Sequence, residues 1–353
     1  MTAYTDEPRD LRAEDAFDTD ALHVWLSART DGLGEAPPEV RQFAGGASNL
    51  TYLLRYPSHD LVLRRPPAGV KAASAHDMRR EHRVQAALAP HYPYVPQMVA
   101  FCDDPAVLGA DFYVMERLAG TILRGRLPKG VELAPEQARE LGLRVVDSLV
   151  ELHQVDVAAA GLGDLGKGLG YVGRQISGWS ERYRHARTEN VPDFEPVMTW
   201  LAERQPADVA NCLVHNDFRL DNLVLDKDLK VIGVLDWEMA TLGDPLMDLG
   251  GALAYWVQAD DEDLFRLSKR QPTDLPGMPT RAQVVDHYRE RTGLAVQDWA
   301  FYEVFGLFRL AGIAQQIYYR YHHGQTTNEA FKDFWLFVTY LEQRCRRIAR
   351  LTA

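Results

Sequence analysis

The chain has 353 residues, of which 46% are hydrophobic and 25% charged, and its formal net charge is -11 at neutral pH. A single hydrophobic core seldom grows beyond about 250 to 300 residues, so this length predicts two lobes or domains. The excess of carboxylates opposes binding to a polyanionic phosphate backbone, which needs clustered lysine and arginine. We therefore expect no nucleic acid among the partners of this protein.

Cysteine usage and the N-terminal residues indicate the compartment. Cys102, Cys212 and Cys345 are widely separated and form no C-x-x-C pair, which argues against a disulfide framework or a zinc site. The N-terminal segment is acidic and polar, and no apolar run approaches the roughly 20 residues of a membrane span. These observations predict a cytoplasmic protein that does not bind a membrane.

The N-terminal third of the sequence predicts a small antiparallel sheet with helices. Residues 17–29 have an amphipathic helical pattern that begins at two good N-cap types, Asp18 and Thr19, and residues 73–88 carry a second helical pattern. Short apolar runs divided by turn residues predict antiparallel strands. The predicted strands cover residues 40–43, 50–56, 60–64, 98–101 and 112–115.

Helical patterns dominate the chain after residue 118, which predicts a change of lobe. The boundaries follow as an N-terminal lobe of residues 1–117 and a C-terminal lobe of residues 118–353. A small mixed lobe before a large helical lobe is an α+β arrangement. In the second lobe we expect a long helix over 135–155, short strands at 223–225 and 231–235, and helices beginning near residues 246, 281, 299 and 329.

One segment of the second lobe has the spacing of a phosphoryl-transfer site. Residues 215–222 read H-N-D-F-R-L-D-N, and an apolar hairpin then leads to Asp236. Phosphoryl transfer needs a carboxylate that accepts the hydroxyl proton and oxygen ligands for magnesium. Asp217 fits the first role, and Asn222 and Asp236 fit the second, because the hairpin returns the chain to the same end. The alternative is a polar hairpin without chemistry.

These motifs resemble the aminoglycoside phosphotransferase-like family, whose loop reads H-G-D-x-x-x-x-N and whose metal motif is I-D-W/F. The resemblance implies a protein-kinase-like bilobal fold, with a small antiparallel-sheet N-lobe carrying a helix and a large, mainly helical C-lobe. Asn216 replaces the usual glycine, and asparagine tolerates the left-handed conformation of a tight turn. Residues 63–69 and 243–249 further resemble the subgroup with kinase domains fused to acyl-CoA dehydrogenases. We therefore expect a functional link to an acyl-CoA dehydrogenase.

The resemblance also implies that ATP binds in the first lobe. The glycine-rich residues 45–49 would form the phosphate turn, with contacts from Gly46, Ser48 and Asn49. The same composition is also typical of a hairpin turn that binds nothing. A hinge over residues 112–118 would bind adenine near Glu116 and Leu118.

An arginine stands where kinases usually carry a lysine on the third strand. Strand alternation places Arg64 and Arg65 on opposite faces, so only one of them can face the phosphates, and Arg64 is our candidate. An arginine keeps the charge and can bind bidentately. Glu81 would be its partner from the helix, although an Arg-rich helical turn is often only a solvated face.

Further residues near the motif have expected supporting roles. Arg219 would neutralise charge on the transferring phosphoryl group, or else form an ion pair with Asp221 or another neighbouring carboxylate. The resemblance implies that His215 braces the loop and that Asp248 bonds back to it. Asp244, before a proline, is expected to cap a helix.

Residues 161–166 match G-x-G-x-x-G, but the context of a dinucleotide site is missing. A predicted helix precedes them instead of a strand, and Gly168 stands where a Walker motif needs a hydroxyl residue. We reject a Rossmann oxidoreductase and expect a loop beside the substrate cleft. Tests for NAD binding would distinguish the two readings.

The sequence weakly favours an anionic acceptor. Residues 167–187 carry one lysine and four arginines against a single glutamate, which disfavours a polycationic aminoglycoside unless these residues only face water. The predicted function is transfer of the ATP γ-phosphate to a hydroxyl of a small molecule, with a hydroxyacyl-CoA-type acceptor ahead of an aminoglycoside. A non-catalytic nucleotide-binding module is the alternative from another class.

Overall fold

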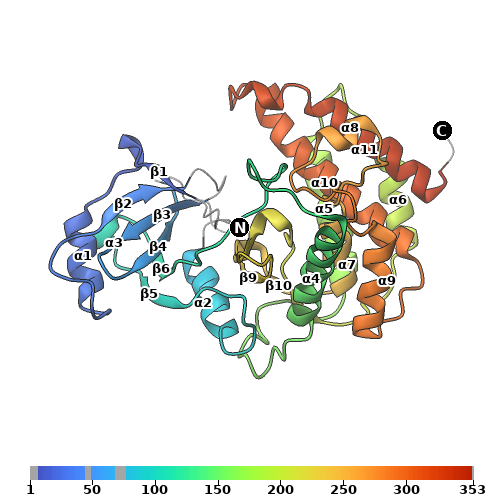
Figure 1. The fold of residues 1–353 in the computed structure, drawn as a ribbon. Helices are drawn as coiled ribbons and strands as arrows, with labels where there is room; N and C mark the ends of the chain where they lie inside the picture. The colour runs from blue at the N-terminus through green and yellow to red at the C-terminus, as the bar shows by residue number, and fades with distance from the viewer. Residues whose placement is uncertain (1–6, 44–48, 68–76, 352–353) are drawn as a thin grey trace. The chain divides into compact units, whose positions relative to one another are not determined.

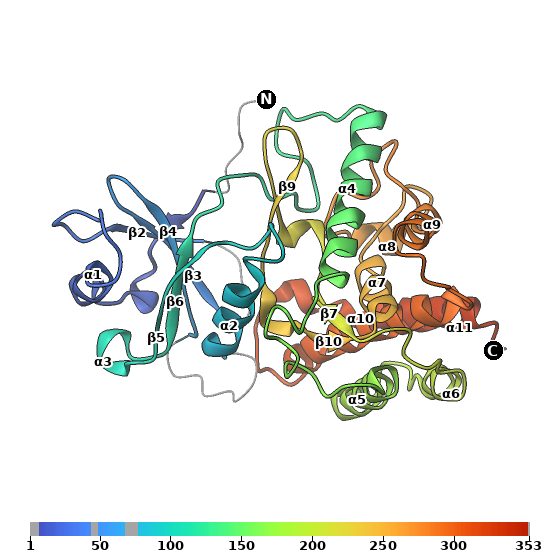
Figure 2. The same cartoon turned by 90° about the horizontal axis from the view of Figure 1, so that it is seen from below.

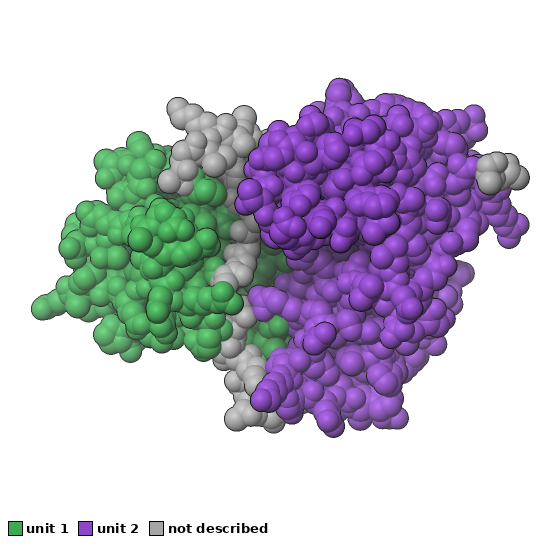
Figure 3. All heavy atoms as spheres, turned by 90° about the horizontal axis from the view of Figure 1, so that it is seen from above, with its two compact units in different colours: residues 1–122, 158–162, 222–240 green, residues 123–157, 163–221, 241–353 purple. Residues whose placement is uncertain are grey.

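The computed structural model describes residues 7–43, 49–67 and 77–351. The chain forms two compact units, which Figure 3 colours separately. Unit 1 comprises residues 1–122, 158–162 and 222–240, and unit 2 comprises residues 123–157, 163–221 and 241–353. The lobe boundary at residues 117 and 118 stays a prediction.

Unit 1 contains a six-stranded sheet in the order β1-β2-β3-β4-β6-β5, and all of its strand pairs are antiparallel. The five predicted strands are present with bounds shifted by one residue at most. Only β1 was not predicted, because two exposed residues carry no alternation. The strands are β1 (Arg9–Asp10), β2 (Glu39–Gln42), β3 (Leu50–Arg55), β4 (Asp60–Arg65), β5 (Met98–Cys102) and β6 (Phe112–Glu116).

Helices α1 (Thr19–Ser27) and α2 (Met78–Leu88) cover opposite faces of this sheet (Figures 1 and 2). α1 begins as predicted, because the Asp18 carboxylate accepts hydrogen bonds from two backbone N–H groups of the first turn. Its apolar side packs on one face, and α2 packs on the face that carries Val62 and Tyr113. The sheet therefore directs alternate side chains of β4 toward α2.

A hairpin from later in the sequence completes unit 1. It consists of β8 (Leu223–Leu225) and β9 (Val231–Val234), and η3 (Trp237–Met239) follows it. The backbone N–H of Val234 donates to the carbonyl of Tyr94, and that of Thr121 donates to Leu225. These bonds fix the predicted magnesium ligands to the N-terminal part of the chain. Unit 1 also holds η1 (Ala13–Asp15) and α3 (Pro105–Leu108).

Unit 2 is mainly helical, and the long helix α10 packs against α5, α7 and α11. None of the described helices is both long enough and apolar enough to cross a membrane. The predicted helices are present, although the last one begins at residue 334 and not near residue 329. The short pair β7 and β10 was not predicted, because each strand has three residues. The helices are α4 (Pro135–His153), α5 (Tyr171–Ala186), α6 (Glu195–Glu203), α7 (Pro245–Leu253), α8 (Asp263–Leu267), α9 (Arg281–Thr292), α10 (Trp299–His322) and α11 (Phe334–Ala349), with η2 (Leu220–Asn222), η4 (Glu329–Phe331), β7 (Cys212–Val214) and β10 (Thr241–Gly243).

The crossing of α7 and α10 depends on two glycines. A Cβ atom on Gly306 would lie 2.1 Å from the carbonyl oxygen of Gly250, and one on Gly250 would lie 2.5 Å from the carbonyl oxygen of Tyr302. Backbone atoms cannot move aside as the end of a flexible side chain can. The close approach of these two helices therefore requires glycine at both positions.

Gly306→Ala should lower the free energy of unfolding by about 1 to 3 kcal/mol, because the added methyl group forces α7 and α10 apart. The measurement is urea unfolding of both proteins. Gly178→Ala in α5 is the matched control, since its nearest neighbour is a flexible arginine end 3.4 Å away. This control should leave stability unchanged or raise it by up to about 1 kcal/mol. Equal effects of the two substitutions would contradict the role of the close approach.

Candidate active site

The loop before Asp217 makes the tight turn expected at this place in the motif. Asn216 has φ of 65°, so it adopts the left-handed conformation that the sequence predicted it to tolerate. Asp248 of α7 accepts from the backbone N–H of His215 at 2.7 Å and from that of Asn216 at 2.8 Å. The predicted contact of Asp248 with the loop is therefore present.

The Asp248 carboxylate is buried and fully engaged. Its Oδ2 atom also contacts Nε2 of His153 at 3.1 Å, and Nδ1 of His153 contacts the hydroxyl of Tyr288 at 2.7 Å. Burial by itself raises the pKa of Asp248, but the hydrogen bond and charge of His153 and the backbone donor of His215 together lower it below its usual value. The ionised carboxylate is therefore the form that holds the loop.

His215 is fully buried and its Nδ1 atom accepts a hydrogen bond from the backbone N–H of Asp217 at 3.2 Å. The ring of Phe218 meets the His215 ring edge to face. These contacts brace the turn from inside, as the resemblance implied for His215. The side chain of Asp217 keeps part of its surface exposed, with 20% of its area accessible.

Arg219 lies between two carboxylates. Its Nη2 atom is 3.0 Å from Oδ2 of Asp217, its Nε atom is 3.4 Å from Oδ1 of Asp221, and its guanidinium lies over the ring of Tyr255. Burial raises the pKa of Asp221, and Arg219 opposes that shift. The ion pairs weighed as the alternative for Arg219 are thus present, while its part in phosphoryl transfer stays a prediction.

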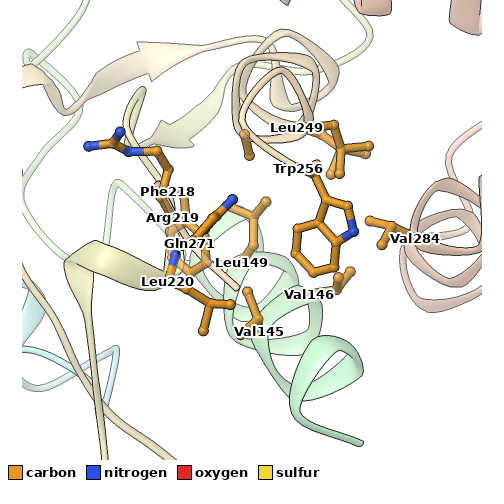
Figure 4. Close-up of a pocket in the computed structure, with 12 residues that line it drawn as sticks. Val145, Val146, Leu149, Phe218, Arg219, Leu220, Leu249, Trp256, Gln271 and Val284 are labelled. Carbon is orange, nitrogen blue, oxygen red and sulfur yellow. Dashed lines mark hydrogen bonds between the residues drawn. The ribbon is translucent and has the colours of Figure 1, made fainter. Parts of the chain in front are cut away.

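A small apolar cavity of about 20 Å³ lies behind the loop (Figure 4). Phe218 and Leu220 line it from the loop, and Trp256 lines it from the segment after α7. Gln271 at its edge accepts a hydrogen bond from the N–H of Leu220 at 2.7 Å. A space of this size admits about one water molecule and no substrate. The cavity therefore supports the loop and is not a binding site.

In unit 1, Arg64 joins the predicted partner Glu81 to Asp236. Its Nη2 atom lies 3.3 Å from Oε1 of Glu81 and 3.2 Å from Oδ1 of Asp236. Burial by itself lowers the pKa of the Arg64 guanidinium, but Glu81 and Asp236 raise it above its usual value. Burial raises the pKa of Glu81, and Arg64 opposes this shift. Arg64 thus remains charged and concentrates positive charge beside Asp236.

The two predicted magnesium ligands lie at the same end of the β8–β9 hairpin. The backbone N–H of Leu235 donates to the carbonyl of Asn222 at 2.9 Å, and Asp236 follows directly in a left-handed conformation. About a third of the Asp236 side chain is exposed. Within the described part of the chain no group of three or more His, Cys, Asp and Glu forms a metal cluster. Magnesium commonly takes only one or two protein ligands together with substrate phosphates, and an Asn–Asp pair fits that pattern.

The segment after Asp236 forms hydrogen bonds with α2 and with Asn49. Asn49 is buried and its Nδ2 atom donates to Oε2 of Glu238 at 3.3 Å. Arg80 of α2 donates to the backbone carbonyls of Glu238 and Ala240. Gly46 and Ser48, predicted to contact the nucleotide, lie outside the described residues. Asn49 and Arg80 thus both contact Glu238, two residues after Asp236.

The predicted hinge, residues 112–118, comprises β6 and the two residues after it. The backbone N–H of Glu116 already donates to the carbonyl of Gln97 at 2.9 Å, so only its carbonyl would be available to adenine. The side chain of Leu118 packs on Gly233, where a Cβ atom would lie 2.2 Å from Leu118 Cδ1. Glycine in β9 therefore leaves the space that Leu118 fills.

Several side chains that the sequence assigned to an acceptor region have structural partners. The glycine-rich residues 161–170 follow the end of α4 and not a strand, which agrees with the rejection of a dinucleotide fingerprint. Arg184 pairs with Glu195 at 2.7 Å, and Arg174 donates to backbone carbonyls of its own loop. Three aromatic residues of unit 2 are buried in the core: Trp179, Tyr183 and Trp256.

Two residues beside the loop had no predicted role. Arg309 of α10 donates to the carbonyl oxygen of Asn216 at 2.6 Å, and Tyr171 donates its hydroxyl to Oδ1 of Asn216 at 2.9 Å. Both lie in helical patterns whose periodicity predicts burial but not a polar contact. An arginine within the apolar stripe of α10 was the available signal, because a buried charge requires a partner.

The fold and this loop define a class, the phosphotransferases with a protein-kinase-like α+β fold. The sequence profile of the Phosphotransferase enzyme family (APH) matches residues 39–292, which is well over half of the chain. The protein belongs to this family.

Two relatives and one more distant structure extend this comparison. A solved "putative aminoglycoside phosphotransferase" from Ralstonia eutropha JMP134 is 33% identical, with a TM-score of 0.81 over 95% of this chain and 99% of that one. Acyl-CoA dehydrogenase family member 10 of Mus musculus is 35% identical over 91% of this chain and 30% of that protein. The chain thus spans under a third of that curated relative. An aminoglycoside phosphotransferase APH(4)-Ia, solved with AMP-PNP and hygromycin B, shares the fold at 14% identity, with a TM-score of 0.57 over 94% of this chain and 98% of that one.

Asp248→Asn should lower the free energy of unfolding by about 1.5 to 3 kcal/mol at pH 7, because an amide offers one acceptor oxygen to donors that now share two. The folded pKa of Asp248 lies below its unfolded value of about 3.9, so its stabilisation is present above that pH and is lost as pH falls through the folded pKa. Urea unfolding between pH 7 and pH 3 should show a smaller acid-induced loss in the variant than in the wild type. Asp263→Asn, at a side chain that is 94% exposed, is the control and should leave the acid slope unchanged. An equal slope in Asp248→Asn would contradict the lowered pKa.

Proposed function

We propose that this protein transfers the γ-phosphate of ATP to a hydroxyl group of a small molecule. In the reaction the hydroxyl oxygen bonds to the γ-phosphorus, ADP leaves, and the hydroxyl proton passes to Asp217. The observation that carries the proposal is the left-handed turn at Asn216, which Asp248 holds through two backbone N–H groups. A fixed turn at this point supports a residue that must keep one orientation through the reaction.

Asn222 and Asp236 would hold magnesium. Their oxygen donors suit a hard cation, and the hairpin bond between Leu235 and Asn222 supports their joint use. When bound, magnesium neutralises charge on the phosphate oxygens. The AMP-PNP in the APH(4)-Ia structure supports a nucleotide as the donor.

We propose the same nucleotide contacts that the sequence predicted for the first lobe. Arg64, held by Glu81, would bind phosphate oxygens, and the buried Asn49 would support the phosphate turn, to which Gly46 and Ser48 are also assigned. The backbone near Glu116 and Leu118 would bind adenine. At Glu116 the carbonyl would serve and not the N–H, since the N–H already donates to Gln97.

Arg219 would have two roles, of which the first is to hold Asp217 and the second is to contact the phosphoryl group. Its contact at 3.0 Å fixes one oxygen of the Asp217 carboxylate. The same guanidinium would neutralise charge on the transferring group, as the motif suggests. Its ion pair with Asp221 limits how far it can move.

We propose a hydroxyacyl-CoA-type acceptor ahead of an aminoglycoside. The name of the mouse relative, acyl-CoA dehydrogenase family member 10, supports the first choice and a functional link to an acyl-CoA dehydrogenase. The name of the Ralstonia protein supports the second. A nucleotide-binding module without catalysis is the alternative that the activity assay decides.

Asp217→Asn should lower kcat by roughly 10² to 10⁴, because the amide cannot accept the proton, and should leave the affinity for the magnesium–ATP complex nearly unchanged. The assay measures ATP consumption with magnesium against hydroxyacyl-CoAs, aminoglycosides, choline-like alcohols and sugars. Asp228→Asn makes the same chemical change on the exposed β8–β9 turn and should leave kcat unchanged. Full turnover by Asp217→Asn would exclude Asp217 as the base. Nucleotide binding without turnover on any acceptor would favour the non-catalytic module.

Arg64→Gln should weaken binding of magnesium–AMP-PNP by about 10- to 100-fold, because it removes the charge that faces the phosphates. Arg64→Lys restores the residue type usual in kinases and should retain most of the affinity. Isothermal titration calorimetry measures both. Arg65→Gln is the matched control on the opposite face of β4, where Arg65 bonds to Tyr52 and to the carbonyl of Asp15. If Arg65→Gln weakened binding as much as Arg64→Gln, the assignment of Arg64 would be wrong.

A further inference from the structure

Asn216 is held from three directions within unit 2. Its N–H donates to Asp248, its carbonyl oxygen accepts from Arg309 at 2.6 Å, and its side-chain Oδ1 accepts from the hydroxyl of Tyr171 at 2.9 Å. The first two contacts use only the backbone, so glycine at this position would keep them. The third needs the side chain of asparagine.

Contacts other than the one with Asn216 also fix the position of Tyr171. It opens α5, and the carboxylate of Asp208 accepts from the N–H groups of residues 170, 171 and 172 at 2.6 to 3.0 Å. Its ring packs where a Cβ atom on Gly243 would lie 2.7 Å away. Burial raises the pKa of the Tyr171 hydroxyl, so the group stays protonated and donates at neutral pH. A donor held this firmly fixes the position of its acceptor.

The contact compensates for a conformational cost. A residue with a Cβ atom is strained at φ of 65°, whereas glycine is not. Asparagine is the residue type that best tolerates this conformation, and a hydrogen bond to its side chain selects it over other backbone states. A glycine at this position would rely on backbone contacts alone. This chain adds a side-chain contact to the same turn.

We propose that Tyr171 and Asn216 form a positioning pair that fixes the direction of Asp217 through the peptide bond that joins Asn216 to Asp217. Neither residue touches the reacting atoms in this role. The catalytic part of the inference rests on the proposed function, in which Asp217 accepts the proton. The structural part, a turn ordered by the Tyr171 hydroxyl, stands independently of it.

Tyr171→Phe removes one hydroxyl and tests the pair. Hydrogen–deuterium exchange at the peptide covering residues 213–218 should become several-fold faster than in the wild type, because the turn loses one of its three anchors. Tyr183→Phe is the matched control on the same helix, since its buried hydroxyl donates to the carbonyl of Pro192, away from the loop. Unchanged exchange in Tyr171→Phe, or equal acceleration in Tyr183→Phe, would overturn the inference.

Turnover tests the catalytic consequence. Tyr171→Phe should lower kcat about three- to tenfold with little change in KM for ATP, as expected for one lost neutral hydrogen bond. Tyr183→Phe should match it in thermal stability but retain wild-type kcat. In an Asn216→Gly background, Tyr171→Phe should have no further effect on kcat, because the two side chains act as one unit. Independent, additive losses would overturn the pairing.

The exchange and turnover measurements together distinguish a failure of this inference from a failure of the proposed function. The exchange measurement needs no turnover, so it decides whether Tyr171 orders the turn even if the wild type phosphorylates no acceptor. Absence of turnover in the wild type would overturn the proposed function and the catalytic part together. Wild-type turnover with unchanged exchange and kcat in Tyr171→Phe would overturn the positioning pair alone.

Discussion

One buried carboxylate determines the geometry of the loop on which the proposed chemistry depends. Asp248 is 1% exposed, and it accepts from two consecutive backbone N–H groups and from His153. A buried charge is costly unless each of its oxygens is bonded, so the loop cannot leave this geometry without exposing an unpaired carboxylate. The same constraint explains why Asn216 keeps a strained conformation. Helix α7 supplies the anchor, and the glycines at its crossing with α10 fix the helix that supplies Arg309.

One partly buried arginine of unit 1 contacts two carboxylates. Arg64 neutralises the buried Glu81 and also contacts Asp236, so one cation serves a structural carboxylate and a proposed magnesium ligand. Arginine suits this double contact better than lysine, because its planar fork presents several donors in fixed directions. The departure from the usual lysine therefore keeps the charge and adds a second contact. It does not argue for loss of nucleotide binding.

The composition of residues 167–187 shows their charge but not the contacts that these charged side chains make. A basic stretch over residues 167–187 favoured an anionic acceptor, but Arg184 pairs with Glu195, Arg174 bonds to its own loop and Arg182 lies over Trp179. These contacts reduce the charge that this stretch offers to a ligand. The support for a hydroxyacyl-CoA-type acceptor thus comes more from the relatives than from the helix. Family membership establishes the phosphotransferase class and leaves the acceptor to the assay.

The sequence by itself determined five of the six strands of the sheet, the caps at Asp18 and Asp244, and the spacing of the motif residues Asp217, Asn222 and Asp236. These depend on neighbours within a few positions, where periodicity and spacing are sufficient. Strand alternation likewise placed Arg64 and Arg65 on opposite faces of β4. Only the tertiary structure decided which residues that are far apart in sequence come into contact. Arg309 reaches Asn216 across 93 positions and His153 reaches Asp248 across 95. Such contacts follow from helix packing, which periodicity cannot specify, because it identifies the buried face of a helix but not what that face meets.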